Sequence, residues 1–161
     1  MIFTEIALKD TFVIDPEPAT DEREMFTKVW CEKEFEMHGL SSRWVQSSIS
    51  INSRKGVLRG MHDRAAPNAE VKLVRCTADA ICGVIVDLRP TSSTYGQHVG
   101  LMLTAENNRS LYIFQQFAHG FLTLQDNSEI FYHMSEFHAP SSARGIGGMT
   151  PCCTSSGPSP L

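Results

Sequence analysis

Short runs of apolar or alternating residues follow one another through the middle of the chain, and Gly, Pro, Ser, Asn and Asp separate them. Their lengths are those of β-strands, and many short strands with regular turn signals are typical of a sandwich or barrel. The pattern therefore predicts an all-β domain. The runs are EVKLVRCT at 70–77, AICGVIVDLR at 80–89, HVGLMLTAE at 98–106, SLYIFQ at 110–115, HGFLTLQ at 119–125 and EIFYHMSEF at 129–137.

Two segments depart from the strand pattern. CEKEFEMHG at 31–39 contains good helix formers and ends at Gly39, a favourable residue just beyond a helix C-terminus, so it predicts one short helix. The stretch 147–161, GGMTPCCTSSGPSPL, has almost no core-forming residues and predicts a disordered or irregular tail. No linker interrupts residues 1–146, which we interpret as one domain.

Composition narrows the function classes. A chain of 161 residues with 42% hydrophobic and 20% charged residues has the profile of a soluble single domain. The net charge of −4 argues against a nucleic-acid surface, although a few local cations can still bind a small anionic ligand. No apolar run approaches a membrane span, and the N-terminus lacks a signal pattern, so we expect a cytoplasmic location without membrane partners.

The histidines and cysteines have no metal-binding spacing. Metal-binding cupins place two histidines at positions i and i+2 of one strand, but here His62 is followed by Asp63 and Arg64. The five cysteines form no CxxC pair and no Cys/His ladder. These observations favour a metal-free site. A metal-dependent cupin oxygenase remains an alternative, which stoichiometric metal in the purified protein would reveal.

Several blocks, in the right order, resemble the dTDP-4-dehydrorhamnose 3,5-epimerase family, whose members are metal-free cupins that act on nucleotide 4-keto-sugars. KGVLRGMH at 55–62 resembles the family's K-G-x-L-R-G-x-H and is the most specific block. The others are DEREMF at 21–26, WVQSSIS at 44–50, KLVRC at 72–76, VDLR at 86–89, FAHGFLTL at 117–124 and EIFYHMSEFHAP at 129–140.

The resemblance implies a cupin-type jelly roll, or double-stranded β-helix, with one or two short helices. It also implies a cofactor-free epimerase of a nucleotide-diphosphate 4-keto-6-deoxyhexose in deoxysugar biosynthesis. By position His62 would be the base, Tyr132 the acid and Lys72 the cation near the keto oxygen. The implied substrate-binding residues are Arg23, Phe26, Gln46, Ser48, Arg59, Lys72 and His119. Phe26 matches a position that lines the family's nucleotide site, and part of that site comes from the partner chain of a dimer. The resemblance therefore implies a homodimer.

The residue types suit this chemistry, although each also has an ordinary structural explanation. A histidine can be neutral near pH 7 and act as a base, and a nearby cation stabilises an enolate. However, a lone histidine in a β protein is more often structural, and Tyr132 could be an ordinary strand residue. Lys72 could be a solvated charge, Arg59 could pair with a carboxylate, and His119 could pack under the following loop.

Departures from the family keep a second function open. Glu24 replaces a glycine, which would cost stability if that position has a positive φ. The segment FQQFAHGF lacks a proline and a glycine that are usual before its FAHGF. The family's later aspartate, which orients the catalytic histidine, has no counterpart here. Asp63 should point to the opposite face of its strand, and Asp87 lies in another strand. A catalytically impaired or inactive sugar-nucleotide-binding relic is therefore the alternative to an active epimerase.

A one-base deletion in the DNA would explain the sequence of the tail from residue 147. Deleting one base from codons for Arg-Trp-Asp-Asp-Pro, a block typical of the family, yields Gly-Gly-Met-Thr-Pro, which is the sequence at 147–151. We therefore interpret the tail as a frameshift product. If restoring one base to the DNA gave no family-like C-terminus, this interpretation would be wrong.

Overall fold

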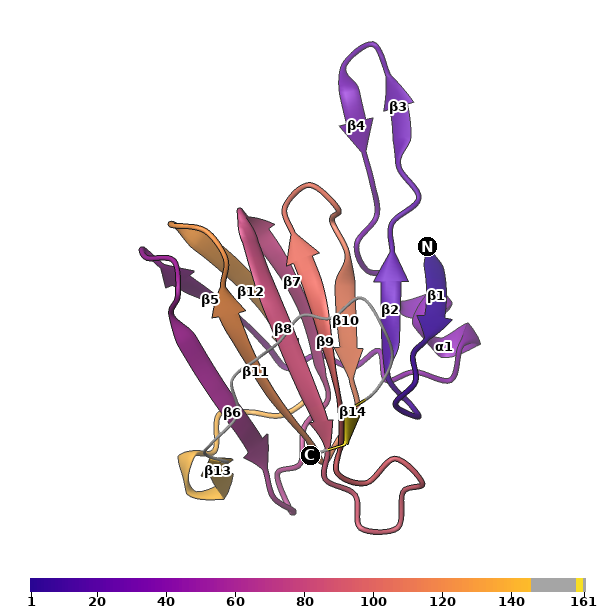
Figure 1. The fold of residues 1–161 in the computed structure, drawn as a ribbon. Helices are drawn as coiled ribbons and strands as arrows, with labels where there is room; N and C mark the ends of the chain where they lie inside the picture. The colour runs from indigo at the N-terminus through magenta and orange to yellow at the C-terminus, as the bar shows by residue number, and fades with distance from the viewer. Residues whose placement is uncertain (146–158, 161) are drawn as a thin grey trace.

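Two six-stranded antiparallel sheets face each other in the computed structural model, which describes residues 1–145 and the backbone of residues 159–160 (Figure 1). The strand order of the first sheet is β1 (Ile2–Glu5), β2 (Phe12–Asp15), β10 (Ser110–Ile113), β7 (Lys72–Ala78), β12 (Ser128–Met134) and β5 (Gln46–Asn52). The order of the second is β13 (Ala143–Gly145), β6 (Leu58–Arg64), β11 (Phe117–Thr123), β8 (Ala80–Asp87), β9 (Gln97–Thr104) and β14 (Ser159–Pro160). This sandwich is the predicted jelly roll.

The remaining elements lie outside the two sheets. β3 (Ala19–Asp21) and β4 (Glu24–Phe26) form a separate hairpin that projects from the sandwich (Figure 1). A short 3₁₀ helix, η1 (Pro140–Ser142), precedes β13. Of the stretch predicted to be an irregular tail, residues 147–158 and 161 lie outside the described part. Its other two residues form β14, which pairs with β9 and so differs from that prediction.

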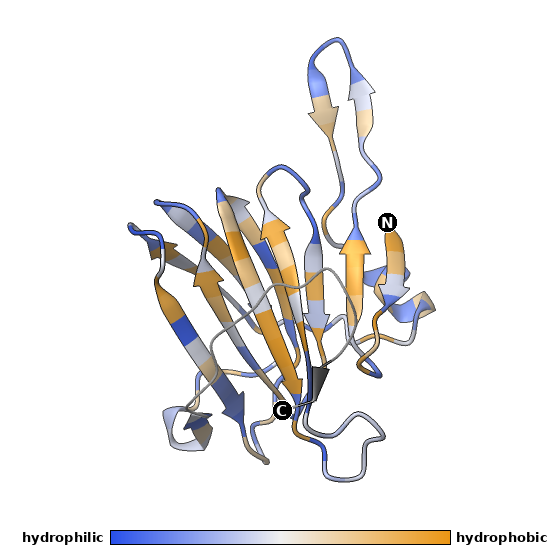
Figure 2. Ribbon diagram, in the orientation of Figure 1, coloured by the Kyte–Doolittle hydropathy of each residue, from blue (hydrophilic) through white to orange (hydrophobic). Residues whose placement is uncertain are grey.

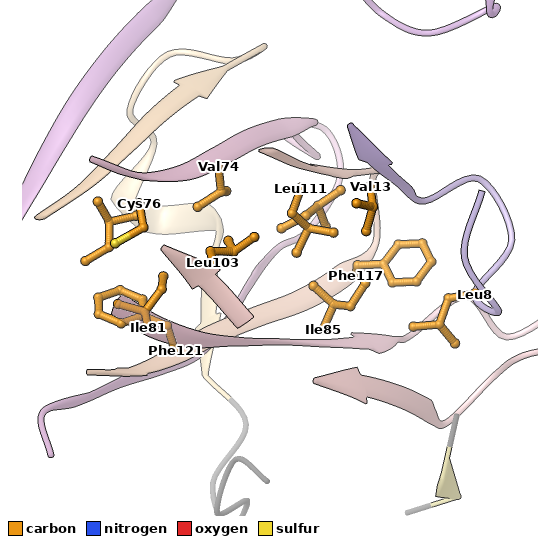
Figure 3. Close-up of a cluster of buried hydrophobic side chains, with 12 residues drawn as sticks. Leu8, Val13, Val74, Cys76, Ile81, Ile85, Leu103, Leu111, Phe117 and Phe121 are labelled. Carbon is orange, nitrogen blue, oxygen red and sulfur yellow. The ribbon is translucent and has the colours of Figure 1, made fainter. Parts of the chain in front are cut away.

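The core lies between the sheets and joins apolar side chains from both. Val74 and Leu111 of the first sheet and Ile85 and Phe121 of the second belong to one buried cluster (Figure 3). All eight residues of β8 are buried, and hydrophobic positions concentrate along this strand (Figure 2). Burying a large aliphatic or aromatic side chain contributes about 1.5–3 kcal/mol, so this cluster is the main source of stability.

Helix α1 (Glu32–Met37) confirms the helix prediction, and its Phe35 packs in one cluster with Leu73 and Tyr112 of the first sheet. Phe35 is fully buried and contacts the rings of Trp44 and Tyr112 edge-on or tilted. Gly39 has φ +69° and donates its N–H to Glu36 O at 2.9 Å, as expected for a glycine that ends a helix.

Two positions where the family has glycine have positive φ in this chain. Glu24, the first residue of β4, has φ +87°, and Gln116, immediately before β11, has φ +63°. A side chain that carries a Cβ is strained in this region by about 1–2 kcal/mol, whereas glycine is not. The concern raised by Glu24 is thus confirmed, and Gln116 adds a second case.

Replacing Gln116 by glycine is therefore expected to raise the free energy of unfolding by about 0.5–1 kcal/mol, after allowing for the greater flexibility of glycine in the unfolded chain. Urea titration would measure the change. Asn127 offers a matched control because its φ is +58°, a conformation that asparagine tolerates well. A gain from Asn127→Gly equal to that from Gln116→Gly would argue against backbone strain as the cause.

Candidate active site

A cavity of about 670 Å³ opens between β5, β7 and β12 of the first sheet and β6 and β11 of the second. Its volume is within the range of small-molecule sites. Seven of the residues predicted from the sequence line it, although they span 87 positions of the chain. They are Gln46, Ser48, Arg59, His62, Lys72, His119 and Tyr132.

A bulge in β6 places Arg59 and His62 on the same face. Residues three apart in a regular strand point to opposite faces. Here His62 pairs with His119 and Arg59 pairs with Phe121, so three steps along β6 match two along β11. The extra residue lies at Gly60 and Met61, and it turns Arg59 into the cavity beside His62. Bulges near active sites commonly redirect side chains in this way.

The bulge depends on a close approach of two glycines. A Cβ on Gly60, where φ is +120°, would lie 2.5 Å from the Cα of Gly120. A Cβ on Gly120 would lie 2.8 Å from Arg59 O and 2.7 Å from Met61 Sδ. Only glycine fits at these two positions, so the glycine of LRGMH and that of AHGF shape the wall behind His62.

The His62 side chain is exposed to the cavity, and no group in residues 1–145 hydrogen-bonds to its ring. The carboxylate of Asp87 is not available to it, because Arg89, Ser92 and Thr94 all hydrogen-bond to that carboxylate. Burial by itself would raise the pKa of Asp87, but these hydrogen bonds outweigh it and lower the pKa well below the usual range. Asp63 is buried and also makes no hydrogen bond with His62.

Tyr132 reaches the cavity from the opposite sheet. It packs against the core cluster, whereas its neighbour Phe131 contacts the ring of His133 on the other face of β12. Burial raises the pKa of Tyr132, and nearby Arg59 opposes that shift only in part. The phenol therefore stays protonated at neutral pH and can donate a proton.

His119 lies beside Tyr132, with 6.2 Å between the ring centroids, and is buried. Its Nε2 has no hydrogen-bond partner among the described residues. Burial, with smaller contributions from Lys72 and His62, lowers the pKa of His119 to about 3. The imidazole is therefore neutral in the folded protein at physiological pH.

This neutral histidine should make stability depend on pH. Its pKa of about 3 in the folded state lies below the unfolded value of about 6.5, so the unfolded chain binds more protons between these values. Stability is then lost as pH falls through this window, at up to about 1.4 kcal/mol per pH unit. Urea titrations at pH 7 and pH 5 should show this loss, and His119→Gln should reduce it. An equal loss in the variant would contradict the assignment.

The cations of the cavity are held by groups that sequence reasoning missed. Arg59 donates from Nε to Asn52 Oδ1 at 2.7 Å, and the buried Asn52 is itself fixed by Ser50 and Ser128 O. Lys72 Nζ lies 2.7 Å from the carboxylate of Glu70. Glu70 is two residues before Lys72 in a strand-like run, and this i, i+2 spacing was a signal that the two could share a face.

Arg23 and Phe26 are not brought to this cavity. Both lie on the projecting β3–β4 hairpin (Figure 1), where the Arg23 side chain is 85% exposed and Phe26 is 81% exposed. Arg23 pairs with Asp21 on the same hairpin at 2.5 Å. Within one chain the hairpin therefore carries both residues away from the sandwich. The expectation that the Phe26 position serves the site of a partner chain concerns a second copy and stays a prediction.

The described residues contain no group of three or more His, Cys, Asp or Glu side chains arranged to hold a metal ion. Among the same residues, no helix is long and apolar enough to span a membrane.

Comparisons with known proteins agree on one family. A family model described as dTDP-4-dehydrorhamnose 3,5-epimerase matches residues 5–153. The chain is 40% identical over 147 residues to the dTDP-4-dehydrorhamnose 3,5-epimerase of Salmonella typhimurium, covering 91% of this chain and 80% of that protein. It is 41% identical over 145 residues to that of Methanothermobacter thermautotrophicus, covering 89% and 77%.

Solved structures give the same result. The crystal structure of the Elizabethkingia anophelis dTDP-4-dehydrorhamnose 3,5-epimerase superimposes with a TM-score of 0.87 at 37% identity, covering 91% of this chain and 80% of that one. A Legionella pneumophila 3,5-epimerase, solved in complex with dTDP-4-keto-L-rhamnose, has a TM-score of 0.83 at 34% identity, with 90% and 77% covered. The chain therefore belongs to the dTDP-4-dehydrorhamnose 3,5-epimerase family.

Proposed function

We propose that this protein epimerises a dTDP-4-keto-6-deoxyhexose at C3, C5 or both, as in deoxysugar biosynthesis. The observation that carries the proposal is the convergence of His62, Tyr132 and Lys72 on one cavity from two facing sheets. An epimerisation beside a ketone needs a base on one side of the sugar, an acid on the other, and a cation for the enolate. Family membership supports the same chemistry.

In this proposal His62 removes a proton from a carbon next to the ketone, and Tyr132 returns a proton from the opposite face. The exposed imidazole can reach a bound sugar, and the Tyr132 phenol, which is protonated at neutral pH, lines the same cavity from the facing sheet. Lys72 stabilises the negative charge that develops on the keto oxygen. Arg59, whose Nε is anchored by Asn52, retains its outer guanidinium nitrogens for the diphosphate.

The test is proton exchange at the two carbons. The purified protein is incubated with dTDP-4-keto-6-deoxyglucose in heavy water, and NMR follows deuterium uptake at C3 and C5. Uptake supports the proposal, and the labelled carbon identifies the position that is epimerised. Absence of uptake, in a folded protein that still binds dTDP, would favour the inactive relic. The 40% identity to a named epimerase argues against that alternative.

The projecting hairpin suggests how a second copy could take part. Phe26 and Met25 are exposed, and Phe26 lies outside the cavity of its own chain. We include in the proposal that the protein is a homodimer in which the hairpin of each subunit brings Phe26, together with Arg23, to the nucleotide end of the partner's site.

Mixing two inactive variants should test this exchange. If Phe26→Ser and His62→Ala subunits form mixed dimers, one site receives both defects and the other receives neither. Deuterium exchange should then reappear on mixing, after mild dissociation and reassociation of the two variants. If the hairpin served its own cavity, no site in the mixture would be intact and exchange would stay low. Co-refolded wild-type protein controls for losses during reassociation.

A further inference from the structure

A buried carboxylate in the cavity wall contacts two cations at once. Glu70 has a side chain that is only 3% exposed, with Lys72 Nζ 2.7 Å from Oε1 and Arg64 Nη1 3.1 Å from Oε2. All three residues line the cavity. The Arg64 contact is an ion pair without hydrogen-bond alignment, and Oε2 has no hydrogen-bond donor among the described residues. Glu70 thus acts on both cations chiefly through its charge.

The second cation connects this carboxylate to the segment that follows β12. Arg64 donates from Nη1 to Phe137 O at 2.9 Å, and its Nη2 lies 3.5 Å from His138 Nδ1. Gln46 also holds this segment, because its Oε1 accepts the backbone N–H of His138 at 2.9 Å. His138 and Gln46 both line the cavity. One carboxylate therefore influences a cation inside the cavity and, through Arg64, the segment at its edge.

We propose that Glu70 is a positioning residue that holds the Lys72 ammonium towards the reacting sugar and, through Arg64, holds residues 137–138 at the edge of the cavity. The inference rests on the proposed function, because it assigns a role in that reaction to a residue that does not touch the reacting atoms. Lys72 is a flexible point charge, so its place in the cavity needs a fixed partner.

A purely structural role is the competing explanation. Buried ion pairs often add little net stability compared with apolar side chains of the same volume. Three charged side chains that all line one cavity are therefore poorly explained by packing alone. The two explanations predict different kinetics. If Glu70 is only structural, its replacement lowers stability but does not lower kcat selectively while KM is retained.

The two contacts of Glu70 predict different kinetic defects. Glu70→Gln keeps the shape but removes the charge, so Lys72 loses its anchor, and kcat should fall roughly 10- to 100-fold with KM changed by less than about 3-fold. Glu70→Asp keeps the charge and should recover part of this loss. Arg64→Gln leaves the Lys72 pair intact, so it should raise KM several-fold while kcat stays within about 3-fold.

The experiment measures kcat and KM for the wild-type protein and for Glu70→Gln, Glu70→Asp and Arg64→Gln by deuterium exchange at C3 and C5, with dTDP binding by calorimetry. Asp15→Asn is the control, because it breaks the Asp15–Arg109 ion pair at 2.7 Å, neither member of which lines the cavity, and it should leave both constants unchanged. Wild-type kinetics in Glu70→Gln, or no recovery in Glu70→Asp, would overturn the inference. Lack of exchange in the wild-type protein would overturn the proposed function, and this inference with it.

If Glu70→Gln does not fold, Arg64→Gln alone decides between the explanations. A KM increase with kcat retained supports the arrangement around Glu70, because the variant breaks one of its two contacts. Equal loss of kcat, or no kinetic change, would overturn it.

Discussion

Replacing His62 by asparagine is expected to slow deuterium exchange by roughly 10²- to 10⁴-fold, which is the usual contribution of a general base. The stability of the protein should change little, since the side chain is exposed and makes no hydrogen bond within residues 1–145. NMR with the 4-keto-sugar substrate in heavy water measures the rate, and thermal unfolding checks the fold.

His38→Asn is a suitable control for this variant. His38 is also exposed but stacks on Phe3 beside helix α1, and it does not line the cavity. Its replacement should leave the exchange rate unchanged. If His62→Asn retained a rate within a few-fold of wild type, another group would have to be the base, and the assignment of His62 would be wrong.

The largest expected loss of stability comes from Gly60→Ala. The new Cβ would meet the Cα of Gly120 at 2.5 Å and His119 O at 2.9 Å, both of which are backbone atoms. Forcing apart β6 and β11 adds about 1–3 kcal/mol of overpacking to about 1–3 kcal/mol for the unfavourable φ of +120°. We expect the free energy of unfolding to fall by about 3 kcal/mol or more.

Gly56→Ala separates the two contributions. Gly56 also has a positive φ, +80°, but a Cβ there would meet nothing within 4 Å. Its replacement should cost only the backbone part, about 1–2 kcal/mol. Urea titration of both variants measures the difference. Equal losses would mean that β6 and β11 can separate freely, and that the glycine contact does not hold the strands.

The sequence pattern predicted the later strands better than the earlier ones, for a physical reason. β7 to β12 each overlap one of the apolar runs, and β8 is buried along its whole length. β5 has exposed or half-exposed residues at six of its seven positions, and the polar β6 is mostly accessible, so their hydrophobic signal is weak. Sheets also bury residues through neighbours that are distant in sequence, which local periodicity does not reveal.

The candidate site was predicted from motif order and not from periodicity. Strict alternation would have placed Arg59 and His62 on opposite faces, and only the bulge at Gly60 brings them together. Similarly, nothing local predicted that Glu70 would meet Arg64 six positions earlier, because that contact requires the end of β6 and the residues just before β7 to converge. Arg23 and Phe26 matched motifs equally well, yet the hairpin separates them from the cavity.

The bulge also limits which mutations β6 can accept. Substitutions at Asp63 or Arg64 alter side chains of the strand but keep the number of residues between Arg59 and His62. Deleting a single residue at Gly60 or Met61 would restore regular pairing with β11 and leave Arg59 and His62 two apart, still on one face. It would also remove the bend and the extra twist that the bulge gives β6, and so change how Arg59 is aimed relative to His62. The length of this segment should therefore tolerate less variation than its composition, and libraries built to alter substrate preference should vary its side chains and leave its spacing unchanged.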